Sequence, residues 1–162
     1  MMRLLLDKGA AVNLADGQGC TALYRASQEG VIPIVRLLLE RGAAVDTQTP
    51  NGTTPLFIAC QNGHVEVAHL LLDCGAAFKH TRAEGCPPLI KACEKGHFSV
   101  ARLLLDRGAD IHSRVLGLRT SLHQASQQGH TEVVDMLLRP GEGRLRGGYG
   151  TCRSSSVFSW KR

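Results

Sequence analysis

The chain has 162 residues, of which 43% are hydrophobic and 20% are charged, a composition typical of a globular domain rather than a disordered chain. Its apolar runs are only a few residues long, whereas a membrane-spanning helix needs roughly 20. The net charge of +5 is concentrated at one end: residues 1–139 carry 14 Lys and Arg against 13 Asp and Glu, and residues 140–162 carry five against one. This near-neutral body argues against nucleic acid as a partner, and the sequence predicts no membrane span.

Glycine, leucine and alanine recur along the chain with a period of 33 residues. The period is seen in two series: Gly30, Gly63, Gly96 and Gly129, and Ala26, Ala59, Ala92 and Ala125. A sustained period of this length is the signature of a solenoid, whose units stack only on their neighbours.

The period divides the chain into successive units. We predict a partial unit over residues 1–15, units over residues 16–48, 49–81 and 82–114, a truncated unit over residues 115–142, and a disordered basic tail over residues 143–162. The partial unit matches only the second helix of the others. In the truncated unit, Leu118 replaces a glycine of the other units, which predicts a distorted loop. The tail is rich in Gly, Ser and Arg, as disordered segments are.

The 49–81 unit indicates how each unit folds. Thr54 suits a helix N-cap and Pro55 the first helical position, and Gly63 suits a left-handed C-cap. A second helix is expected to bury Leu71, and residues 76–85 are expected to form an extended, hairpin-like loop. Helices this short are marginal alone, so we expect stacking between units to stabilise them.

A resemblance to the ankyrin repeat is carried by the runs Thr54-Pro55-Leu56-Phe57-Ile58-Ala59, Gly63-His64-Val65-Glu66-Val67 and Leu70-Leu71-Leu72 with Gly75-Ala76. The pattern extends over residues 1–139. The resemblance implies an all-α solenoid of stacked helix-turn-helix units with β-turn finger loops, and a role in binding another protein rather than in catalysis. It also implies that His64, His97 and His130 hydrogen-bond the backbone of a neighbouring loop.

Six cysteines and seven histidines form no C-x-x-C pair and no close cluster, so no metal site is predicted. Cys60 and Cys93 lie one period apart at a helical position that suits core packing. Nucleophile-elbow and phosphate-loop motifs are missing from the sequence, so we expect no catalytic residue, no cofactor and no small-molecule substrate. With no secretory signal we expect reduced thiols, in the cytoplasm or the nucleus.

Residues that differ from unit to unit are expected to bind the partner, because on a repeated scaffold only these residues distinguish one partner from another. In ankyrin-like arrays the finger tips and inner helices line one concave face. On this basis the predicted partner-binding residues are Gln18, Arg25, Gln28, Asn51, Thr53, Ile58, Gln61, Glu84, Lys91, Lys95, Arg119, Gln124 and Gln127. Tyr24, Phe57 and Ile90 share the slot of His123, either as semi-exposed anchors or as loop-to-helix packing.

Two functions fit this pattern. The first is a non-catalytic protein-interaction module that acts as an adaptor, scaffold or inhibitor. The second is a regulatory or substrate-recruiting fragment of a larger enzyme or of a ubiquitin-ligase adaptor. The second requires an additional domain, and we identify none: residues 140–162 do not resemble a SOCS box. We therefore favour the first.

Overall fold

The computed structural model describes residues 10–77, 86–115 and 119–139. These residues form eight α-helices and no sheet, which confirms the predicted all-α class. The helices come in consecutive pairs: α2 (Ala22–Glu29) and α3 (Ile32–Glu40), α4 (Pro55–Asn62) and α5 (Val65–Asp73), α6 (Pro88–Glu94) and α7 (Phe98–Asp106), and α8 (Ser121–Gln127) and α9 (Thr131–Leu138).

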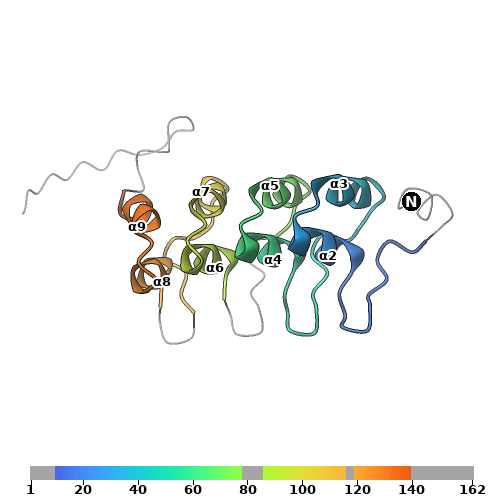
Figure 1. Ribbon diagram of the computed structural model, residues 1–162, viewed down its shortest axis with the longest axis horizontal. Coiled ribbons are helices and arrows are strands. Elements are labelled where there is room, and N and C mark those ends of the chain that lie inside the picture. Colours follow the sequence, from blue (N-terminus) through green and yellow to red (C-terminus); the bar gives the residue numbers. More distant parts are fainter. Residues whose placement is uncertain (1–9, 78–85, 116–118, 140–162) are drawn as a thin grey trace, which may run out of the picture.

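The helices lie in two rows (Figure 1). The inner row contains α2, α4, α6 and α8, each in contact with the next inner helix. The outer row contains α3, α5, α7 and α9, each packed on the inner helix that precedes it. The loops before α2 and α4 project from the inner row on the side away from the outer row. The arrangement is the stacked helix-turn-helix solenoid that the period predicts.

Local sequence explains where the inner helices begin and end. The Oγ1 atoms of Thr21 and Thr54 each accept a hydrogen bond of 3.2 Å from a backbone N–H of the first helical turn, as N-caps do. Gly63 ends α4 with φ of 81°, in the left-handed region, so the predicted caps of this helix are confirmed. Pro87 stands at the same place before α6 and makes no side-chain cap.

A histidine and a glycine join each unit to the next. The Nε2 atoms of His64, His97 and His130 lie 3.0 Å from the carbonyl oxygens of Gln28, Gln61 and Glu94, respectively. A carbonyl oxygen only accepts, so in each case the Nε2–H donates. A Cβ built on Gly30 would lie 2.5 Å from Nδ1 of His64, so the glycine makes room for the imidazole as well as allowing the positive φ. The backbone role implied for these histidines is confirmed.

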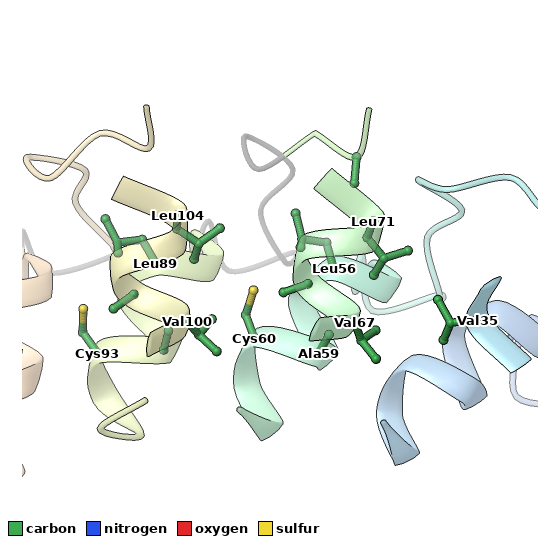
Figure 2. Close-up of a cluster of buried hydrophobic side chains, with 14 of the residues drawn as sticks. Val35, Leu56, Ala59, Cys60, Val67, Leu71, Leu89, Cys93, Val100 and Leu104 are labelled. Carbon is green, nitrogen blue, oxygen red and sulfur yellow. The ribbon is translucent and has the colours of Figure 1, made fainter. Parts of the chain in front are cut away.

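The core runs between the rows and through all four helix pairs. Figure 2 shows the part of it between Val35 of α3 and Leu104 of α7. One leucine of each outer helix is buried there: Leu38, Leu71, Leu104 and Leu137. The alanines of the repeated series are buried in the inner helices, where a small side chain lets neighbouring helices approach. Cys60 and Cys93 are fully buried beside them, as predicted for core packing.

The first and last fingers share one hydrogen-bond pattern at their bases. The backbone N–H of Asp16 donates to the oxygen of Cys20 at 2.9 Å, and that of Val115 donates to the oxygen of Arg119 at 3.0 Å. The base of the last finger is therefore like that of the first. The tip at Leu118, where distortion is predicted, lies outside the described residues, as do most of the 76–85 loop and the tail over residues 143–162. None of the described helices is both long and apolar enough to cross a membrane.

Candidate functional site

The candidate site is the inner face, which we define as the inner helices α2, α4, α6 and α8 together with the finger loops that precede them. Six predicted binding residues are exposed on these elements: Gln18, Arg25, Asn51, Lys95, Arg119 and Gln127. Four more are partly exposed: Gln28, Gln61, Lys91 and Gln124. Glu84 lies outside the described residues.

Thr53 and Ile58, the other two predicted binding residues, are buried, with exposed fractions of only 8% and 7%. Phe57 and Ile90 are 1% and 0% exposed, so of the two alternatives for this slot, packing rather than a semi-exposed anchor holds for both. The physical reason is the position of α4 and α6 inside the stack. Each has an inner helix on both sides, and in α4 every residue from Pro55 to Cys60 is buried.

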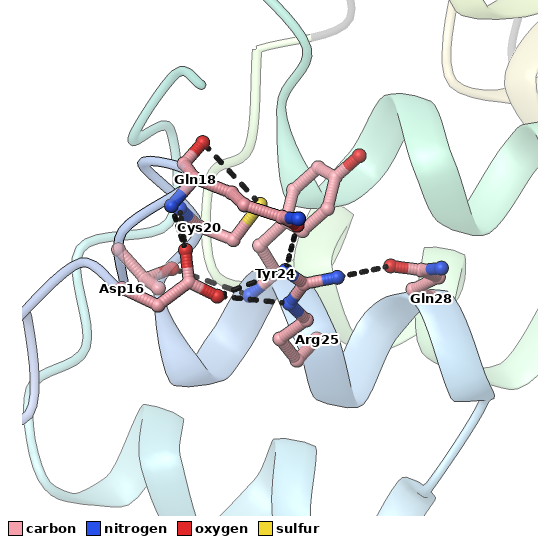
Figure 3. Close-up of polar contacts among 7 residues, drawn as sticks. Asp16, Gln18, Cys20, Tyr24, Arg25 and Gln28 are labelled. Carbon is pink, nitrogen blue, oxygen red and sulfur yellow. Dashed lines mark hydrogen bonds and ion pairs between the residues drawn. The ribbon is translucent and has the colours of Figure 1, made fainter. Parts of the chain in front are cut away.

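The N-terminal end of the inner face is organised around Arg25 (Figure 3). Its Nε and Nη2 atoms donate to Oδ2 of Asp16 at 3.1 and 2.9 Å, and Nη2 also donates to Oε1 of Gln18. The Oδ1 atom of Asp16 accepts from the backbone N–H groups of Gln18 and Cys20, each at 2.9 Å. The N–H of Cys20 and then the guanidinium of Arg25 hold the pKa of Asp16 below its usual value. The charge of Arg25 is therefore already paired within its own unit.

The middle of the inner face carries a second internal ion pair. Lys91 and Glu94 lie three residues apart on α6, and Nζ of Lys91 is 2.9 and 2.8 Å from the two carboxylate oxygens of Glu94. Between this pair and Arg25, Asn62 donates from Nδ2 to the carbonyl oxygen of Gln28 at 2.9 Å and so links two units. Charge in the middle of the face is largely neutralised.

The C-terminal end of the inner face is different. Lys95, Arg114 and Arg119 are exposed there, and the described part of the chain gives none of the three an ion-pair partner. Arg119 has a neutral neighbour, since its Nη1 donates to Oε1 of Gln127 at 3.4 Å. No Asp or Glu occurs between residues 111 and 131 of the sequence. Positive charge at this end is therefore left available to a ligand.

The outer helices carry a polar cluster that spans two units. Nη2 of Arg107 is 2.9 Å from Oδ1 of Asp73, and Nδ1 of His69 is 2.8 Å from Oδ2 of the same carboxylate. Nη2 of Arg107 also lies 3.1 Å from Nε2 of His69, which must accept this hydrogen bond from the guanidinium. These charges are engaged with one another, unlike those at the C-terminal end of the inner face.

The described cysteines do not cluster, and those buried in the core are poorly suited to act as nucleophiles or metal ligands. Four in the described ranges are free thiols: Cys20, Cys60, Cys74 and Cys93. Burial raises the pKa of Cys60 to about 12 and that of Cys93 to about 11, which keeps both protonated at neutral pH. Within the described ranges, no group of three or more His, Cys, Asp or Glu could hold a metal ion.

Stacked helix pairs, projecting loops and repeated histidine–glycine joints together define a helical-repeat solenoid. A comparison with protein families agrees: the model described as "Ankyrin repeats (3 copies)" matches residues 1–49, 42–115 and 78–145. The chain therefore belongs to the ankyrin repeat family. Ankyrin repeats are generally protein–protein interaction modules, and such domains are typically non-catalytic. A search of curated proteins finds no match.

Two features of the site were not predicted from the sequence. The first is Asp16, which holds Arg25 from the opposite side of a finger loop. The second is Arg114, which lies across the base of the last finger from Thr120. A usable signal was the stretch without acidic residues that contains both Arg114 and Arg119.

Proposed function

We propose that this chain is a non-catalytic protein-interaction module, an adaptor, scaffold or inhibitor, that binds its partner on the inner face. The observation that carries the proposal is the variation at one repeated slot of the inner helices. Arg25, Lys91 and Gln124 occupy this slot in three units and are at least partly exposed, whereas Ile58 in the remaining unit is buried. A row of different side chains on an ordered frame selects a partner with little loss of conformational entropy.

The outer helices are the alternative place for a partner to bind, and the ion pairs on them make binding there less favourable. Their central charges pair with one another across two units through Asp73 and Arg107. A partner that docked there would have to displace or desolvate these pairs, which offsets the gain from new contacts.

Site-specific photocrosslinking in cells tests the proposal. A photoreactive amino acid is placed in the full chain at Gln61 or Gln124 on the inner face, and at Arg36 or Arg102 on outer helices as matched controls. All four side chains are at least partly exposed. We expect discrete crosslinked proteins from the inner positions and none from the outer positions. Crosslinks from the outer positions alone, or from no position, would contradict the proposal.

We also propose that the chain works in a reducing compartment, the cytoplasm or the nucleus. The support is two of its thiols: Cys60 and Cys93 are fully buried in the core and are free. Unpaired thiols persist in compartments that keep cysteine reduced. Imaging of a fluorescent fusion of the full chain tests this, and recovery of the fusion from the secretory pathway would contradict it.

A further inference from the structure

We propose that the partner segment is acidic, and that its carboxylates bind the C-terminal end of the inner face at Lys95 and Arg119. This inference rests on the proposed function, because it names the chemistry of the partner that the inner face would bind. The occupant is a protein segment rich in Asp or Glu, lying over α6 and α8.

The first step of the argument is the difference between cations that are paired and cations that are not. Arg25 lies 2.9 Å from Asp16, and Lys91 lies 2.8 Å from Glu94. In the described ranges neither Lys95 nor Arg119 has such a partner, although both are exposed. A carboxylate from another chain would therefore pair with Lys95 and Arg119 without having to displace an internal one.

The second step is the absence of carboxylates from the last finger and α8; Glu94 of α6, next to Lys95, is already paired with Lys91. The nearest acidic residues to the last finger and α8 along the chain are Asp110 and Glu132. The intervening segment contains Arg114 and Arg119 and no carboxylate. A surface with one sign of charge steers an oppositely charged ligand and selects against ligands of its own sign.

The third step is the set of amide side chains on and next to α8. Gln124 is partly exposed, and Gln127 and Gln128 are exposed, along and just beyond α8. An amide side chain both donates and accepts hydrogen bonds, so these residues match the backbone groups of an extended peptide. Proteins that bind single-stranded nucleic acid instead combine cations with aromatic side chains that stack on bases. Neither α6 nor α8 contains Phe, Tyr or Trp. The surface therefore fits an acidic peptide better than a nucleic acid.

Fluorescence anisotropy with the full chain and a labelled peptide of alternating glutamate and serine tests the inference. The site variant combines Lys95→Glu with Arg119→Glu. The matched control combines Arg36→Glu with Arg102→Glu on the outer helices and changes the net charge equally. The cations of residues 140–162 are the same in both variants, so any binding to them is a constant background. Circular dichroism confirms that both variants fold.

We expect the site variant to bind the peptide about tenfold more weakly than the unmodified chain, and the control to change affinity less than about twofold. Raising NaCl from about 50 to about 300 mM should remove most of this difference. A peptide with glutamine in place of glutamate should not discriminate between the variants. Equal weakening in both variants, or no weakening in either, would overturn the inference. Binding of an oligouridine probe that is tighter than peptide binding and depends on Lys95 and Arg119 would also overturn it.

The two proposals fail in different ways. If inner-face crosslinks identify partners whose crosslinked segments lack Asp and Glu, the proposed function stands and the acidic-partner inference is wrong. If no inner-face crosslink forms while the glutamate peptide still requires Lys95 and Arg119, the charge chemistry is correct and the proposed function is wrong.

Discussion

The 49–81 unit and the 115–142 unit follow the same pattern, yet their helices are covered very differently. In α4, all six residues from Pro55 to Cys60 are buried, whereas in α8 only Ser121 and Ala125 are. The difference comes from position: α4 has α2 on one side and α6 on the other, whereas the only described inner helix next to α8 is α6. A unit's burial is therefore set by its neighbours more than by its own residues.

The same contrast is seen at the joints. A Cβ on Gly63 would lie 2.7 Å from the imidazole of His97, whereas a Cβ on Gly129 would have no described atom within 4 Å apart from those of its chain neighbours. Leu138 of α9 is 62% exposed, although its counterparts Leu72 and Leu105 are partly buried against the core. These pairs of equivalent positions allow the contribution of a neighbouring unit to be measured within one chain.

The largest effect is expected from truncating leucines in the two units. Leu71 is fully buried, so Leu71→Ala should lower the free energy of unfolding by about 2–5 kcal/mol through the cavity that it leaves. Leu138→Ala should cost less than about 1 kcal/mol, because the side chain is mostly in water. Urea unfolding followed by circular dichroism measures both. A loss for Leu138→Ala as large as that for Leu71→Ala would show that the Leu138 side chain is covered by protein rather than by water.

The buried thiol of Cys60 predicts a loss of stability in alkali. Burial raises its pKa from 9.0 to about 12, so the folded state binds this proton more tightly than the unfolded state. The contribution of this proton to the free energy of unfolding is complete below pH 9. It is lost as pH rises toward 12, and the free energy of unfolding then falls by about 1.4 kcal/mol per pH unit.

Comparison with Cys60→Ala isolates this effect, because other groups titrate equally in both chains. Ser126 occupies the same slot as Cys60 in the last unit but is exposed. In the Cys60→Ala background, Ser126→Cys should therefore add no loss of stability in alkali. Its exposed thiol should react rapidly with iodoacetamide. Rapid alkylation of native Cys60 at neutral pH would contradict its burial.

Glycine substitutions test the joints. Gly63 and Gly129 both have positive φ, 81° and 77°, so replacement by alanine should cost about 1 kcal/mol at each from backbone strain. At Gly63 the new methyl group also displaces His97, whose hydrogen bond to the carbonyl of Gln61 contributes about 1 kcal/mol more. In thermal unfolding, Gly63→Ala should therefore have a lower melting temperature than Gly129→Ala. Identical melting temperatures would mean that the imidazole joint contributes nothing.

The smallest effect is expected at the cross-unit ion pair of the outer face. Arg107→Ala removes a contact to Asp73 between side chains that are 31% and 49% exposed, and such pairs are typically worth less than about 1 kcal/mol. The loss should shrink further as salt is added. Arg102→Ala, which removes a pair within α7 alone, is the control. A loss that is large and independent of salt would show that the outer-face cluster holds the two units together.

Local features of the fold could be predicted from the sequence because short-range chemistry determines them. The cap at Thr54, the left-handed turn at Gly63 and the buried slot of Cys60 each follow from residue type and period. The candidate face, as a set of elements, was instead implied by the resemblance to the ankyrin repeat. Ten of its predicted residues are at least partly exposed on those elements.

The sequence alone therefore determined the period, the helices and the elements that form the inner face. The tertiary structure decided which side chains on that face are available to a partner. Ile58 is buried because inner helices flank α4 on both sides, and Arg25 is neutralised because the finger brings Asp16 back to it. Lys95 and Arg119 remain without an ion-pair partner in the described structure. Burial and pairing depend on residues brought together from neighbouring elements, and no single unit of the repeat contains that information.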